Sequence, residues 1–112
     1  MSFYLIQASY STQATAAMIN NPQDRAAAVR PVIERMGGKL HGLWLAFGEY
    51  DAVVIAELPD NVSAAAVSMA VGSSGGISSY RTTPLITSSE AMEAMKKANA
   101  AGYQPPDYSR VL

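Results

Sequence analysis

Residues 40–58 most constrain how this chain can fold, because they contain two apolar runs separated by a short polar turn. The stretch reads LHGLWLAFGEYDAVVIAEL, and Gly48-Glu49-Tyr50-Asp51 separates the runs. Aromatic and β-branched residues such as Trp44 and Ile55 favour strands. A glycine at the junction is expected to supply the positive φ of a tight turn. The stretch therefore predicts a β-hairpin.

The predicted strands are apolar on both of their faces. Successive strand residues point to opposite faces, so a strand with one face in water alternates apolar and polar residues. Neither arm of the hairpin shows this alternation, and neither does the strand predicted over residues 3–10. We therefore expect helices to cover one face of the sheet and another copy of the chain to cover the other.

Start and stop signals place helices on either side of the hairpin. A short helix is predicted over residues 13–19. Asn21 followed by Pro22 is typical of a second helix start, and Gly37-Gly38 of its end. Pro31 lies inside this helix and predicts a kink, because proline lacks a backbone donor and clashes with the preceding turn.

A further helix is expected after a cap at Asp60 or Asn61 and extends to about Val71. Its buried stripe is predicted at Val62, Ala66 and Met69.

Residues 77–87 predict a fourth strand, and Pro84 within it indicates an edge position because proline cannot donate to a neighbouring strand. The resulting order is strand–helix–strand–strand–helix–strand. This order predicts an α+β, ferredoxin-like βαββαβ fold with one four-stranded antiparallel sheet and helices on one face. The expected spatial order of the strands is fourth–first–third–second.

A capping box formed by Thr87 and Glu90 predicts one more helix, which ends before Gly102. Prolines then favour an extended tail. The tail keeps several apolar side chains, namely Tyr103, Tyr108, Val111 and Leu112. It is therefore expected to lie across a surface such as that of a partner subunit. Residues 1–87 are predicted to form the ferredoxin-like domain, with residues 88–112 as a C-terminal helix and tail of the same domain.

Size and charge exclude several classes of function. The chain has 112 residues, a net charge of −1 and no cysteine. There is no electrostatic case for nucleic acid or for an anionic membrane. Disulfides, thiol catalysis and cysteine-based zinc sites are excluded. The N-terminal residues lack a basic region followed by an apolar core, and no window approaches the roughly 20 apolar residues of a membrane span. A soluble cytoplasmic protein is expected.

The order of several short motifs resembles the GYD-domain family, whose members are small proteins related to the dimeric α/β-barrel superfamily. These motifs are Gly37-Gly38-Lys39-Leu40, Gly48-Glu49-Tyr50-Asp51, Pro59-Asp60 and Arg81-Thr82-Thr83. The likeness covers roughly the first three-quarters of the chain. It implies a ferredoxin-like subunit that forms a dimer or a larger homo-oligomer, and it assigns no particular reaction.

The candidate ligand-binding residues gather at the hairpin turn and on the fourth strand: Trp44, Gly48, Glu49, Tyr50, Asp51 and Arg81. Arg81 needs a partner if it is buried, and Asp51 or Glu57 could serve; alternatively, its guanidinium binds a ligand carboxylate. Asp51 has an architectural alternative, in which it accepts backbone donors at the turn while Glu49 lies in water.

His41 is the only histidine. Some relatives in the barrel superfamily use a histidine in catalysis or as a haem ligand, so the resemblance makes His41 a candidate. The alternative is a partly exposed histidine on an edge strand. With one histidine, no cysteine and scattered carboxylates, no tightly bound transition metal and no cofactor are expected.

Two functions remain open at this point. The first is a non-enzymatic small-molecule-binding or assembly protein, with a pocket between sheet and helices or at a subunit junction. The second is a cofactor-independent enzyme, such as an oxygenase or isomerase, acting on an aromatic or electron-rich small molecule, as several superfamily relatives do. An enzyme requires several convergent polar groups in an enclosed apolar cavity, whereas a binding protein requires only the cavity.

Overall fold

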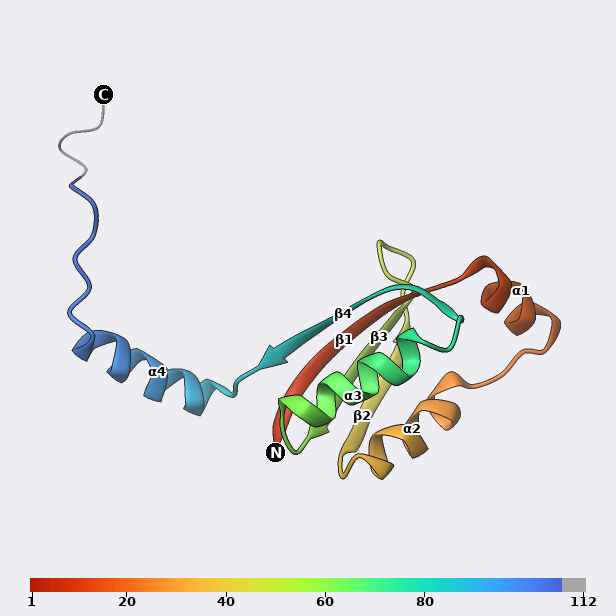
Figure 1. The fold of residues 1–112 in the computed structure, drawn as a ribbon, viewed down its shortest axis with the longest axis horizontal. Helices are drawn as coiled ribbons and strands as arrows, with labels where there is room; N and C mark the ends of the chain where they lie inside the picture. The colour runs from red at the N-terminus through yellow and green to blue at the C-terminus, as the bar shows by residue number, and fades with distance from the viewer. Residues whose placement is uncertain (108–112) are drawn as a thin grey trace.

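The computed structural model describes residues 1–107 and confirms the ferredoxin-like α+β fold (Figure 1). Four strands form one antiparallel sheet in the order β2-β3-β1-β4. This is the predicted order, and β4 with Pro84 is an edge strand. The elements are β1 (Ser2–Tyr10), α1 (Thr12–Asn20), α2 (Arg25–Arg35), β2 (Lys39–Leu45), β3 (Ala52–Leu58), α3 (Asn61–Gly72), β4 (Ile77–Leu85) and α4 (Ser88–Ala100).

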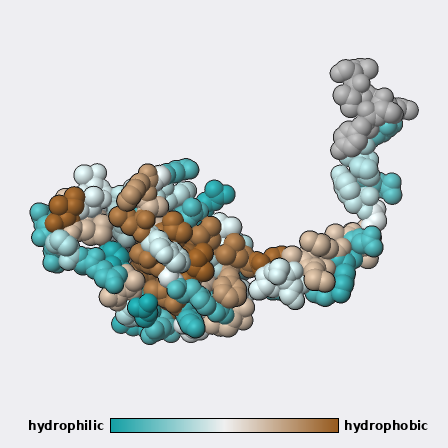
Figure 2. Space-filling model, turned by 180° about the vertical axis from the view of Figure 1, so that it is seen from behind, coloured by the Kyte–Doolittle hydropathy of each residue, from teal (hydrophilic) through white to brown (hydrophobic). Residues whose placement is uncertain are grey.

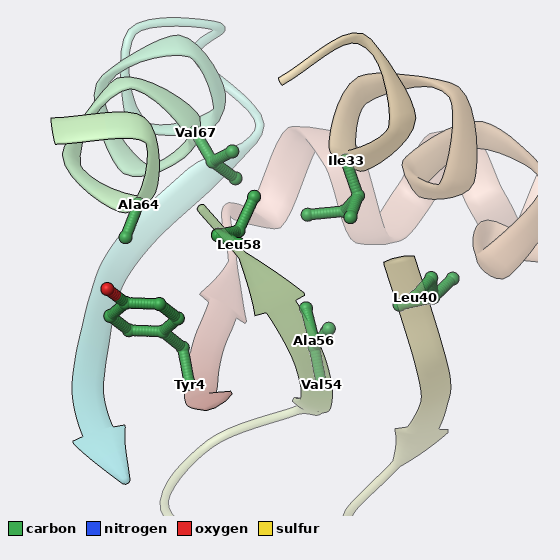
Figure 3. Close-up of a cluster of buried hydrophobic side chains, with 8 residues drawn as sticks. All are labelled: Tyr4, Ile33, Leu40, Val54, Ala56, Leu58, Ala64 and Val67. Carbon is green, nitrogen blue, oxygen red and sulfur yellow. The ribbon is translucent and has the colours of Figure 1, made fainter. Parts of the chain in front are cut away.

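Helices α2 and α3 cover one face of the sheet, with α2 packed over β2 and α3 over β4 (Figure 1). The core lies beneath them, and Tyr4, Ile33 and Leu58 are its largest fully buried side chains (Figure 3). The Tyr4 hydroxyl donates to Asn61 Oδ1 at 2.7 Å, which satisfies the polar end of a buried phenol.

Helix α2 begins later than the sequence predicted. Its N-cap is Asp24, whose Oδ1 accepts from the Ala26 N–H at 2.9 Å, so the prediction of a helical start at Pro22 was wrong. An Asp side chain satisfies a free N–H of the first turn, which favours this boundary. The helix then continues through the exposed Pro31 to Arg35, and Gly37 beyond it has a φ of +80°.

The buried stripe of α3 also differs from the prediction. Val62 and Met69 are 79% and 69% exposed, whereas Ala64, Val67 and Ser68 are buried. The Asp60 cap is confirmed, since its side chain accepts from the Ser63 N–H at 2.8 Å. With the helix started there, small side chains face the sheet and allow close approach. The Ser68 hydroxyl pairs with the Thr82 hydroxyl at 2.7 Å.

Helix α4 projects away from the sheet, together with residues 101–107 (Figure 1). Its predicted capping box is present, and the Thr87 N–H holds the pKa of the Glu90 carboxyl below its ordinary value. None of its residues is buried, and Met92 and Met95 are exposed. Because α4 projects, the radius of gyration is 18.7 Å, which is larger than the value of about 13 Å for a compact chain of 100 residues.

The extended tail is only partly described. Tyr103 is exposed, whereas Tyr108, Val111 and Leu112 lie outside the described residues, so the expectation that the tail covers a surface remains a prediction.

Candidate functional site

An apolar cavity of about 270 Å³ lies between the sheet and the two covering helices. Helices α2 and α3 pack over the outer strands β2 and β4, so the space between them lies above the central strands β1 and β3. Small side chains of Ala8 and Ala52 on these strands and Ala70 on α3 line this space. Most of the other lining residues are Val, Ile, Leu and Tyr. The cavity therefore follows from where the sequence places alanine beneath the helices.

The cavity adjoins an open groove near the N-terminal end of α2. Groove and cavity share the lining residues Tyr10, Arg25, Leu43 and Ala52. The groove is also lined by α1 and by the connection from β2 to β3, including Gly48 and Asp51. Two members of the predicted site therefore lie beside the cavity entrance.

Asp51 ties the hairpin to the end of β1. Its Oδ2 accepts from the Tyr10 N–H at 2.9 Å, and its own N–H donates to the Ala8 carbonyl at 2.9 Å. Its carbonyl accepts from the Ala46 N–H at 2.7 Å. Only the first of these bonds uses the Asp51 side chain, and its donor belongs to β1 rather than to the turn. The other two are backbone bonds, so the architectural role of Asp51 stays a prediction.

Gly48 does not have the positive φ that the sequence predicted. Among the described residues, positive φ occurs at Gly37, Gly75 and Gly102, and a Cβ added to Gly48 would contact nothing within 4 Å. The connection between β2 and β3 spans residues 46–51, which is longer than the two-residue loops that demand positive φ.

Glu49 and Tyr50, the other two candidate residues of the turn, do not line the groove. Glu49 is exposed, and its carbonyl accepts from the Ser9 hydroxyl at 3.2 Å. Tyr50 is half-buried and lines neither the cavity nor the groove.

Trp44 and Arg81 lie on the opposite face of the sheet from the cavity. The strand register pairs Trp44 with Val53, Val53 with Gln7, and Gln7 with Arg81. These four residues form one row across the face away from the helices. The two ends of this row lie on opposite edge strands, about 14 Å apart at three strand spacings. Arg81 thus lies on the open face, whereas Asp51 lines the groove, and neither ion pair of the described residues contains Arg81.

His41 lies on this open face at a bulge in β2. Its Nε2 is 2.6 Å from Glu57 Oε1, and its ring centroid is 5.3 Å from that of Phe3. Glu57 is therefore the partner of His41 and does not pair with Arg81. Within residues 1–107, no group of three His, Asp or Glu side chains could hold a metal ion.

Arg25 is the residue that the sequence analysis missed. Its Nη1 donates to Gln23 Oε1 at 2.6 Å, while its Nε is buried and has no hydrogen-bond partner in the described chain. One sequence signal could have indicated it. The positive end of a helix dipole disfavours a cation in the first turn, so an arginine there suggests a use for its charge.

The contacts of Asp51 lead to a stability prediction. Asp51→Ala leaves the Tyr10 N–H without its acceptor and should lower the free energy of unfolding by about 1–2 kcal/mol. Asp51→Asn, which keeps an acceptor oxygen, should lose less. Arg81→Met on the exposed strand should change stability by less than about 0.5 kcal/mol. Urea unfolding followed by circular dichroism measures all three; a larger loss for Arg81→Met than for Asp51→Ala would contradict the architectural role.

A four-stranded antiparallel sheet of this order, with helices on one face and a cavity beneath them, defines a ferredoxin-like α+β protein. The family assignment identifies the chain more specifically than its fold class does. The GYD domain model matches residues 4–95, and the chain belongs to the GYD domain family. Comparison with curated proteins finds no match. No helix among residues 1–107 is long and apolar enough to cross a membrane.

Proposed function

We propose that this protein binds a small, largely apolar molecule in the cavity between α2, α3 and the sheet. The observation that supports this proposal is the cavity itself. Ligand pockets are concave and lined mainly by apolar side chains, and this space has both properties. An engineered apolar cavity of about 150 Å³ already holds benzene, and this one measures about 270 Å³.

Binding is supported better than the enzymatic alternative. A catalytic site requires several convergent polar groups, and the polar groups that line this cavity are few. The Ser68 hydroxyl is engaged by Thr82, and the Asp51 carboxylate at the entrance accepts from the Tyr10 backbone. A cofactor-independent oxygenase or isomerase would have to act with the Tyr10 and Tyr80 hydroxyls and Arg25, which also line the space.

The cavity proposal predicts that filling the space abolishes binding. Val29 lines the cavity from α2, whereas Ala27 on the same helix is exposed and does not. Octan-1-ol titrated into the protein by calorimetry should bind the natural sequence with a Kd below about 1 mM. Val29→Phe should reduce this binding at least about tenfold, and Ala27→Phe, the matched control, should not.

A measurement of stability and a second variant keep this test decisive. Thermal unfolding shows whether Val29→Phe still folds, since overpacking a core costs about 1–3 kcal/mol. Ala28→Leu, at an exposed position of the cavity lining, provides a second and milder filling variant. If the natural sequence binds none of octan-1-ol, octanoate and 3-phenylpropionate, or if both filled variants bind octan-1-ol unchanged, the cavity is not a binding site.

We also propose that the protein self-associates through the open face of the sheet. Hydrophobic residues gather on this side of the molecule, seen from behind in Figure 2. Phe3, Leu5, Val53 and Ile55 point to this face, each only partly buried, and Trp44 is 55% exposed. Monomeric proteins rarely expose large contiguous apolar patches. A second copy related by a two-fold axis would cover the same patch on both subunits.

Helix α4 supports the same proposal. An isolated helix of 12–15 residues or fewer is marginal in water, and α4 has 13 residues, none of them buried in the described chain. Its exposed Met92 and Met95, like the preceding Ile86, therefore need a surface to pack on. A partner subunit would supply one.

A further inference from the structure

We infer that the cavity takes an apolar monocarboxylate, whose hydrocarbon part lies between α2, α3 and the sheet and whose carboxylate is bound by the Arg25 guanidinium. This inference rests on the proposed binding function and names the chemical class of the ligand. Arg25 is the first residue of α2 and lines both the cavity and the groove. Its charge therefore lies where the apolar interior meets the solvent-facing entrance.

One nitrogen of the guanidinium has a hydrogen-bond partner, and another is buried without one. Nη1 donates to Gln23 Oε1 at 2.6 Å, whereas Nε is buried without an acceptor among residues 1–107. Buried donors without partners are uncommon, because leaving one unpaired is costly. Nε and Nη2 point in parallel from the side of the guanidinium away from Nη1, and two such donors match the two oxygens of a carboxylate. Nε is enclosed by protein atoms in this structure, so the Arg25 side chain turns toward the groove when a carboxylate binds to its Nε and Nη2 donors.

The charges around the entrance favour a single negative charge on the ligand. Asp24 and Asp51 both line the groove beside Arg25. Their carboxylates accept backbone donors, from Ala26 and Tyr10 respectively, and neither forms an ion pair with Arg25. Arg25 and the positive end of the α2 dipole attract an anion. The two nearby carboxylates repel any negative charge, and direct contact with Arg25 offsets this repulsion for one carboxylate only. A second charge has no such contact, which disfavours dicarboxylates and phosphate monoesters.

The size of the cavity limits the hydrocarbon part. Its volume of about 270 Å³ lies just below the range of roughly 300–1,000 Å³ typical of ligand pockets. A medium-length alkyl chain or one substituted aromatic ring fits such a space, and both can carry a carboxylate. The two types of acid share the chemistry that Arg25 recognises, and direct comparison separates them.

The test uses two acids and their neutral counterparts with the full chain. Octanoate, octan-1-ol, 3-phenylpropionate and 3-phenylpropan-1-ol are titrated by calorimetry at pH 7 and low salt. At least one acid should bind about tenfold more tightly than its alcohol, and the tighter acid identifies the alkyl or aryl class. Arg25→Met should weaken that acid about tenfold and leave its alcohol within about twofold. Arg30→Met removes an exposed arginine from the same helix and should change neither.

The outcomes separate this inference from the function on which it rests. If the alcohols bind as tightly as the acids, or if Arg25→Met binds the acids unchanged, the cavity binds neutral molecules and the carboxylate assignment is wrong. If neither acids nor alcohols bind, both proposals fail. Should Arg25→Met unfold, Arg25→Lys keeps the charge but loses the two parallel donors, and it should weaken acid binding severalfold; unchanged binding in Arg25→Lys would overturn the two-donor assignment.

Discussion

Gly38→Ala should lower the free energy of unfolding by about 3 kcal/mol, one of the two largest effects that we expect of any single substitution in this protein. A Cβ at position 38 would collide with the backbone carbonyl of Glu57, and it would lie 2.7 Å from Leu58 Cδ2 and 3.1 Å from Ile33 Cγ2. The carbonyl belongs to β3, and Leu58 and Ile33 are fully buried core residues. None of these atoms can move away without disturbing the packing of α2 on the sheet.

The matched control is Gly48→Ala at the hairpin turn. Nothing lies within 4 Å of a Cβ added there, and the backbone has no positive φ, so its stability should change by less than about 0.5 kcal/mol. Urea unfolding followed by circular dichroism measures both variants, and the melting temperature of Gly38→Ala should fall by about 10 °C. Equal losses in the two variants would contradict the packing seen around Gly38.

If the protein self-associates through the open face as proposed, Ile55→Asp should give a folded monomer. Ile55 lies on β3, where the register pairs it with Leu5 on β1 and Gly42 on β2. It therefore stands at the centre of the open face. In a two-fold interface this substitution would bury two unpaired carboxylates, and each such charge costs several kcal/mol. In a monomer the same residue would point into water, so the fold should persist.

Light scattering at micromolar concentration measures the mass of each variant. The natural sequence should give at least twice the mass of one chain, and Ile55→Asp should give the mass of one chain with an unchanged circular dichroism spectrum. Ala65→Asp places the same charge at an exposed position of α3 and should leave the oligomer intact. A monomeric natural sequence, or an Ile55→Asp variant that remains oligomeric, would contradict association through the open face.

Local sequence signals predicted the parts of the structure that depend on neighbouring residues. Pro84 indicated an edge strand, Thr87 with Glu90 indicated a capping box, and both are present. Such features arise from a missing donor or from hydrogen bonds within one turn, so a short stretch of chain decides them. The order of elements then left few possible arrangements, because the ferredoxin-like order fixes the sheet topology.

The candidate site could not be predicted from such local sequence signals. Arg81 lies in the middle of β4 and Asp51 directly before β3, and the register places Arg81 on the open face whereas Asp51 lines the groove. A shift of one residue would exchange the faces of a strand, and pairing across three strands is not encoded in any one of them. The prediction of the buried stripe of α3 failed for a similar reason. Small residues suit close packing against the sheet, and the larger Val62 and Met69 stay exposed.

The sequence alone determined the fold class, the strand order, the edge position of Pro84 and the cap at Thr87, and it limited the cap of α3 to Asp60 or Asn61. Tertiary structure alone decided that Asp51 bonds to the end of β1, that a cavity lies over the central alanines, and that Arg25 lies at its entrance. The physical reason is the range of the interactions. Caps and proline effects act within a few residues, whereas a cavity is what remains after helices and strands distant in sequence have packed together.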